Sequence, residues 1–201
     1  MQLRVPAPCP GCELDVGALT HHEIVARLRV MPRRYRLALT RVQPGENAEA
    51  MIRQRPRPDV WSALEYAAHA GDMLDIMSPA IQLMEVDDEP KVFFFDPEEQ
   101  AEEMEYNNWS TMEVITRLET AGADLSAVIE WVNADQWDRT GIFPWGTQTI
   151  RASAEQMVHE AHHHLEDIVA GLDALRKAQN PYAGGLGDGG SDDEPDSSAP
   201  G

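Results

Sequence analysis

The chain is poor in basic residues and in cysteine. Lysine plus arginine total 16 against 35 aspartate plus glutamate, which gives a formal net charge of -19. Proteins that bind nucleic acid need a basic surface to meet the phosphates, and anionic membranes attract basic segments. This charge balance therefore argues against both kinds of partner. Two cysteines in 201 residues are also too few for a disulfide framework.

Long apolar runs are missing as well. Residues 1–8 contain no apolar core of a signal peptide, and no run approaches the ~20 apolar residues that a membrane-spanning helix needs. We therefore expect a cytoplasmic protein that acts on a small molecule, with no nucleic-acid or membrane partner. At 201 residues the chain is long enough for one domain, and 42% hydrophobic residues are enough for a substantial core.

Four segments combine a helix-start signal with apolar residues spaced three and four apart. The starts have the capping-box pattern and lie at Thr20 to Glu23, Ser62 to Glu65, Ser110 to Glu113 and Ser153 to Gln156. Pro32 should kink the first helix or end it early, and Asn180-Pro181 should end the last one. Because no strand alternation is evident, the sequence predicts an all-α four-helix bundle over residues 20–180 with long connecting loops.

The two ends of the chain differ in composition from this bundle. Residues 1–19 form an N-terminal extension that carries Cys9-Pro10-Gly11-Cys12. Residues 181–201 contain glycine, aspartate, serine and proline but no basic residue, which predicts a disordered acidic tail. The connections between the helices are long, and we expect some of them to cover the open end of the bundle.

Four of the seven histidines lie between residues 159 and 164, inside the last predicted helix. His159 and His163 are four apart, so they are stacked one turn above each other and can bind one metal ion. His69 lies in the middle of the second predicted helix. Two ligands from one helix and one from another are typical of a site with an open coordination position. The alternative is a solvated, histidine-rich helix face without metal.

The other histidines and the cysteines leave several interpretations open. His162 lies on the apolar stripe of its helix and is expected to be a core residue bonded to a backbone carbonyl, whereas His164 should lie on the surface. The cysteine pair has the C-x-x-C spacing of redox and zinc sites. It could be an idle or structural pair, a small metal clip completed by His21 and His22, or a redox couple.

Carboxylates and arginines near these histidines supply further candidates. Glu65 and Asp72 lie one turn either side of His69, and Glu166 shares a face with His159 and His163, so each could orient a ligand or move a proton. Arg57 follows Arg53 and Arg55 just before the His69 helix and could bind an anionic cosubstrate. The alternative for these arginines is a solvated loop that pairs with the protein's own acids.

Three segments carry a resemblance to a known family. They are Arg57-Pro58-Asp59-Val60-Trp61-Ser62-Ala63-Leu64-Glu65-Tyr66 followed by His69, Trp137-Asp138-Arg139-Thr140-Gly141, and Val158-His159-Glu160-Ala161-His162-His163-His164-Leu165-Glu166-Asp167-Ile168. Over residues 9–178 the chain resembles the DinB-like (YfiT-like) metalloenzyme superfamily. The resemblance implies a divalent metal held by His69, His159 and His163. Zinc is the first choice, with nickel or iron as alternatives.

The resemblance also implies a function. Such proteins include transferases and isomerases that use bacillithiol, mycothiol or glutathione, so we expect a metal-dependent S-transferase of the mycothiol type that acts on a small electrophile. The family makes a homodimer plausible. One branch replaces a histidine ligand by glutamate, and this chain, with three histidines, departs from it. The alternatives are a non-catalytic, metal-stabilised binding module that sequesters a ligand or partner, and a structural bundle without metal.

Overall fold

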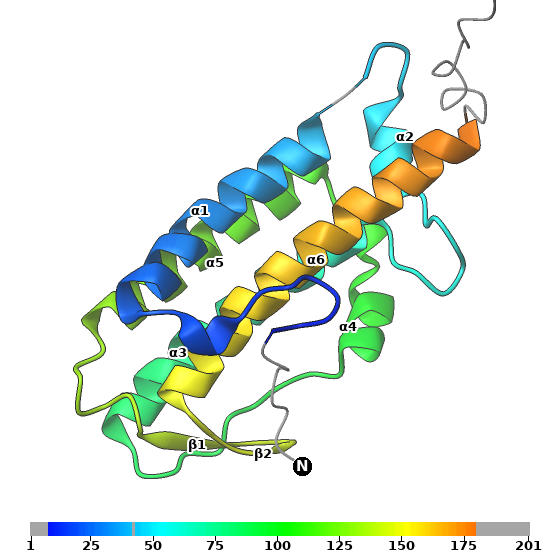
Figure 1. The fold of residues 1–201 in the computed structure, drawn as a ribbon. Coiled ribbons are helices and arrows are strands. Elements are labelled where there is room, and N and C mark those ends of the chain that lie inside the picture. The colour runs from blue at the N-terminus through cyan, green and yellow to red at the C-terminus, as the bar shows by residue number, and fades with distance from the viewer. Residues whose placement is uncertain (1–7, 42, 180–201) are drawn as a thin grey trace, which may run out of the picture.

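Four long helices build the molecule, as the computed structural model shows for residues 8–41 and 43–179 (Figure 1). They are α1 (His21–Thr40), α3 (Ala63–Val86), α5 (Thr111–Trp131) and α6 (Ile150–Gln179). Each of α1 and α3 packs against both α5 and α6, so the four helices enclose one apolar core. The predicted four-helix bundle is confirmed. The predicted acidic tail at 181–201 lies outside the described residues.

Three of the four predicted helix starts are confirmed by hydrogen bonds. The side chains of Thr20, Ser62 and Ser110 each accept a hydrogen bond from the backbone N–H three residues later. At Thr20 and Ser62 a glutamate also reaches back to the cap residue, which completes the capping box. These local bonds fix the start of each helix independently of the rest of the fold.

The predicted start of the last helix is wrong. α6 begins at Ile150, and Ser153 is buried inside it rather than capping it. The side chain of Thr149 instead accepts a hydrogen bond from the backbone N–H of Ala152 at 3.0 Å. The preceding hairpin brings the chain to this threonine, so the helix starts one turn earlier than the capping pattern indicates.

The expectation that Pro32 would end the first helix early is also wrong, because α1 continues through it to Thr40. Pro32 is buried against α5, where Gly122 leaves room for its ring. A Cβ atom at residue 122 would come within 2.6 Å of the Cγ of Pro32. The close approach of these two helices therefore depends on a proline facing a glycine.

The N-terminal extension and the long connections contain short ordered elements. They are η1 (Val16–Ala18), α2 (Ala48–Arg53), α4 (Pro97–Met104), η2 (Tyr106–Asn108) and an antiparallel hairpin of β1 (Thr140–Phe143) and β2 (Gly146–Thr149). The backbone of Val92 donates to the carbonyl of Ile142 in β1 at 2.9 Å, which ties the connection after α3 to the hairpin. No helix of the described part of the chain has the length and apolar character needed to cross a membrane.

Candidate metal centre and the adjoining cleft

Helix α6 carries metal-binding side chains in two pairs, each spaced four residues apart. One pair is His159 and His163, and the other is Glu160 and His164. Because successive residues of an α-helix are rotated by about 100°, the two pairs point in different directions. The first pair lies beside the N-terminal segment, and the second lines a cleft that also contains His69 of α3.

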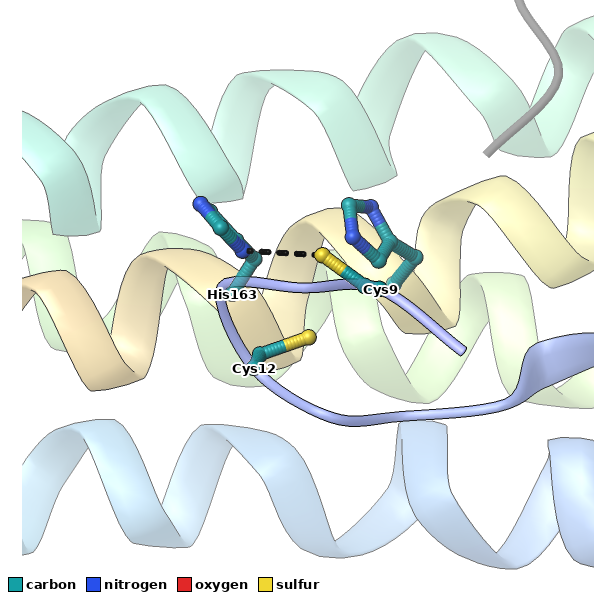
Figure 2. A group of neighbouring side chains, drawn as sticks. Cys9, Cys12 and His163 are labelled. Carbon is teal, nitrogen blue, oxygen red and sulfur yellow. Dashed lines mark hydrogen bonds between the residues drawn. The ribbon is translucent and has the colours of Figure 1, made fainter. Parts of the chain in front are cut away.

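The N-terminal segment passes over α6 (Figure 1). It brings two thiols close to the first pair. The sulfur atoms of Cys9 and Cys12 and one ring nitrogen each of His159 and His163 all lie within 4.8 Å of one another. Cys9 Sγ is 3.7 Å from His163 Nδ1, and Figure 2 shows both cysteines beside that ring. In the part of the chain that the structure describes, no other group of three or more potential metal ligands lies so close together.

The turn that holds the thiols is fixed by backbone hydrogen bonds and by a glycine. The N–H of Cys9 donates to the carbonyl of Leu14 at 3.0 Å, and the N–H of Glu13 donates to the carbonyl of Cys9 at 2.7 Å. A Cβ atom at Gly11 would lie 2.7 Å from Cε1 of His163. The turn can therefore rest on the histidine ring only because residue 11 has no side chain.

The environment of this cluster favours the thiolate form of Cys9 but the protonated forms of Cys12 and His159, whose pKa Glu160 raises. The neighbouring His159 imidazole and the backbone N–H groups of Cys12 and Gly11 lower the pKa of the Cys9 thiol to about 6, whereas burial raises the pKa of the Cys12 thiol. His159 is buried, and neither of its ring nitrogens makes a hydrogen bond. A buried polar atom without a hydrogen-bond partner destabilises the folded protein. A bound metal ion would remove this cost for one nitrogen of the His159 ring.

The second pair faces a cleft of about 310 Å³ between α3, α4 and α6. Its lining consists of Asp59, Trp61, Tyr66, His69, Pro97, Glu98, Glu160 and His164. His69 is 3% exposed, and its ring lies 5.2 Å from that of His164, between centroids. No hydrogen-bond partner reaches Nδ1 of His69. The His164 side chain is only 15% exposed, so the predicted surface position of His164 is wrong.

Carboxylates hold His164 on the wall of this cleft. Its Nδ1 lies 3.2 Å from Asp167 Oδ2, and its Nε2 lies 3.4 Å from Glu160 Oε2. Burial alone would lower the pKa of His164, but these two acceptors raise it to about 9. Burial and the charge on His164 lower the pKa of His69 to about 4, so the His69 ring is neutral at neutral pH.

The structure thus divides the three histidines of the predicted metal site between two places. His159 and His163 lie together, with their ring centroids 5.2 Å apart, but the side chains that join them are Cys9 and Cys12. His69 lies in the cleft with Glu160 and His164. The donor atoms of these cleft residues are spread more widely than those of the cysteine–histidine group.

Glu65 and Asp72, predicted to orient His69, take part in other interactions. Glu65 caps α3 and forms an ion pair with Arg55 at 2.7 Å. Asp72 accepts hydrogen bonds from the Tyr106 hydroxyl at 2.7 Å and from Arg117 at 2.8 Å. Both carboxylates are buried, and neither belongs to the lining of the cleft.

The other two predicted site residues are more exposed. Glu166 lies 3.6 Å from Arg34 on the outside of the bundle. Arg57 has 70% of its side chain exposed and lies 3.5 Å from Asp59, which lines the cleft. Arg57 is therefore close to the cleft, whereas Glu166 is not part of its lining.

Sequence reasoning missed the proximity of Cys9 and Cys12 to α6. The expected partners were His21 and His22, but Nε2 of His21 lies 2.9 Å from the carbonyl oxygen of Ile129, and neither histidine belongs to the group around the cysteines. No spacing rule connects a turn near residue 10 with a helix near residue 160. The signal for the cleft was present, because Glu160 and His164 have the same four-residue spacing as the chosen pair.

Comparison with known proteins supports the fold and the family. Residues 27–168 match the family model described as the DinB superfamily. YfiT from Bacillus subtilis, described as "a probable metal-dependent hydrolase with an unusual four-helix bundle topology", has a TM-score of 0.69 at 14% identity, over 79% of this chain and 87% of that one. The mycothiol-dependent maleylpyruvate isomerase has a TM-score of 0.60 at 17% identity, over 76% of this chain and 62% of its own. No curated protein matches.

Proposed function

This chain belongs to the DinB superfamily, and from that premise we propose that it is a divalent-metal-dependent S-transferase. It would join a low-molecular-weight thiol of the mycothiol type to a small electrophilic molecule. The observation that carries the proposal is the cleft in which His69, Glu160 and His164 meet. A mycothiol-dependent enzyme among the similar structures supports the choice of thiol.

The side chains of the cleft fit a catalytic metal. Two imidazoles and one carboxylate are a donor set found at catalytic zinc sites, and three protein ligands leave a coordination position free. His69 is neutral and its buried Nδ1 has no hydrogen-bond partner, whereas His164, whose pKa is raised to about 9, would release a proton on binding the ion. Nickel or iron would suit the same nitrogen and oxygen donors. A bound divalent ion would supply the positive charge that keeps a thiol in its thiolate form at neutral pH.

The surrounding residues orient these ligands and shape the cleft. Asp167 accepts a hydrogen bond at Nδ1 of His164, which leaves Nε2 of that ring directed toward Glu160. Trp61 and Tyr66 form an aromatic wall that limits the access of water and contacts the apolar part of a substrate.

Two further side chains have roles in this proposal. Glu98 lines the cleft and would accept the proton that the thiol releases. The thiolate sulfur then forms a bond to the electrophilic carbon, and the displaced electron pair moves to the leaving group or to a conjugated carbonyl oxygen. Arg57, beside Asp59, would bind an anionic group of the thiol cosubstrate.

The test is adduct formation by the untagged protein with a panel of thiols and model electrophiles, followed by mass spectrometry. The variant His164→Ala should abolish adduct formation and remove one equivalent of metal, while the helical circular dichroism stays unchanged. His22→Ala, at an exposed position of α1, is the matched control and should keep both properties.

Two results would overturn the proposal. Full turnover by His164→Ala would exclude the cleft as the reaction site. Thiol binding without an adduct from any electrophile would support the alternative, a binding module that sequesters its ligand.

A further inference from the structure

We propose that the chain holds a second metal ion, a zinc ion bound by Cys9, Cys12, His159 and His163, at a site separate from the cleft. This site lies beyond the proposed function, because it uses none of the three metal ligands assigned to the cleft. Its ligands come from the N-terminal turn and from the neighbouring face of α6.

The spacing of the ligand atoms is close to that of a tetrahedral zinc site. Zinc–sulfur bonds of about 2.3 Å and zinc–nitrogen bonds of about 2.0 Å place neighbouring ligands roughly 3–4 Å apart. Cys9 Sγ and His163 Nδ1 already lie 3.7 Å apart, and all four ligand atoms lie within 4.8 Å of one another. Side-chain movements of less than about 1 Å would complete the coordination sphere.

The chemistry of the donors points to zinc. Two thiolates and two imidazoles form the Cys2His2 set of structural zinc sites, and thiolate ligands exclude magnesium and calcium. The C-x-x-C spacing of Cys9 and Cys12 is the usual one for two thiolates that share a zinc ion. The i, i+4 spacing of His159 and His163 places two rings on one side of a helix.

Two independent observations show that the site is built for a ligand. The ring of His159 is buried, yet neither nitrogen has a hydrogen-bond partner. Gly11 provides the space in which the turn lies against the His163 ring, since a Cβ atom there would be 2.7 Å from it. A bound zinc ion would give one of these nitrogens a partner and would account for the close packing of the turn, while Glu160 Oε1 lies 3.5 Å from Nδ1 of the same ring.

Four protein ligands leave no coordination position for a substrate, so this zinc has a structural role. It would fasten the N-terminal segment to α6. The site also adjoins the cleft through Glu160, whose Oε1 lies 3.5 Å from His159 Nδ1 and whose Oε2 lies 3.4 Å from His164 Nε2. Zinc binding would therefore help to fix the helix face that forms the wall of the cleft.

The experiment replaces zinc by cobalt(II) in the untagged full-length protein and records the absorption spectrum. Two thiolate ligands in a tetrahedral site should give intense sulfur-to-cobalt charge-transfer bands in the near ultraviolet. The double variant Cys9→Ser/Cys12→Ser should lose these bands and one equivalent of metal. His69→Ala is the matched control, because it affects only the cleft and should keep the bands.

A second measurement guards against a variant that misfolds. In the wild-type protein, removal of zinc by a chelator should increase hydrogen exchange of the amides of Cys9 and Glu13, whose backbone bonds close the turn. Cobalt spectra without charge-transfer bands, or bands that persist in the double variant, would overturn the proposal. If Cys9 and Cys12 react with a thiol reagent equally fast with and without chelator, the proposal is also overturned, and a redox pair is favoured.

These outcomes are distinct from those that test the S-transferase. Loss of adduct formation with intact thiolate bands would concern the cleft alone. Loss of the bands with retained turnover would concern the N-terminal zinc site alone.

Discussion

Replacing Gly11 by alanine should weaken zinc binding at the N-terminal site while leaving the metal-free protein intact. The added Cβ would meet Cε1 of His163 at 2.7 Å, a distance that two carbon atoms do not tolerate. In the metal-free protein the His163 side chain, which is 32% exposed, can turn aside. When the ring is fixed by a zinc ion it cannot turn away without losing the bond.

The expected magnitude follows from this difference. Inserting a methyl group into a closely packed site costs about 1–3 kcal/mol. Since about 1.4 kcal/mol corresponds to a tenfold change in affinity, the zinc dissociation constant should rise by roughly one to two orders of magnitude. The unfolding free energy of the metal-free variant should change by less than about 0.5 kcal/mol, as for an ordinary surface substitution.

The assay is competition for zinc against a chromophoric chelator, combined with urea unfolding in the presence of excess chelator. Gly17→Ala is the matched control in the same segment, because a Cβ at that position meets only Asp15 Oδ1, at an ordinary 3.5 Å. An unchanged zinc affinity in Gly11→Ala would refute the reasoning. Equal destabilisation with and without zinc would refute it too, because the clash would then be independent of the metal.

Two further predictions concern the bundle itself. Gly122→Ala should lower the unfolding free energy by about 1–3 kcal/mol, because the new methyl group would meet Pro32 at 2.6 Å. Gly171→Ala, at an uncrowded position of α6, should instead raise it by about 0.5–1 kcal/mol. Urea titration of both variants measures the two changes. Burial opposes ionisation of Glu65, but its bonds to Arg55 and to the start of α3 lower the pKa of its carboxyl. The resulting stabilisation is present at neutral pH and is lost as the pH falls through that lowered pKa. The difference in unfolding free energy between wild type and Glu65→Gln should therefore shrink on acidification, and a difference that stays constant with pH would contradict this.

Local signals in the sequence were sufficient for most of the helical fold. The starts at Thr20, Ser62 and Ser110 were predicted correctly because the cap bonds join residues only three apart. The start at Ser153 was predicted wrongly because the hairpin before α6 moved the helix start to Ile150. The hairpin itself was missed because four-residue strands carry too short a pattern to recognise.

Helix continuation past Pro32 depended on a distant residue. A proline inside a helix removes one backbone hydrogen bond and crowds the preceding turn, which favours an early end. Packing of the proline ring into the space left by Gly122 on α5 keeps the helix intact. Nothing near Pro32 in the sequence indicates that partner.

The sequence alone determined that the last helix carries pairs of metal ligands four residues apart, because helical periodicity is a local property of the chain. Only the tertiary structure decided which pair meets His69 and which meets Cys9 and Cys12. The rotation of a helix about its own axis is set by its packing against the other helices. The same packing brings the N-terminal turn onto α6, and no local pattern contains that information.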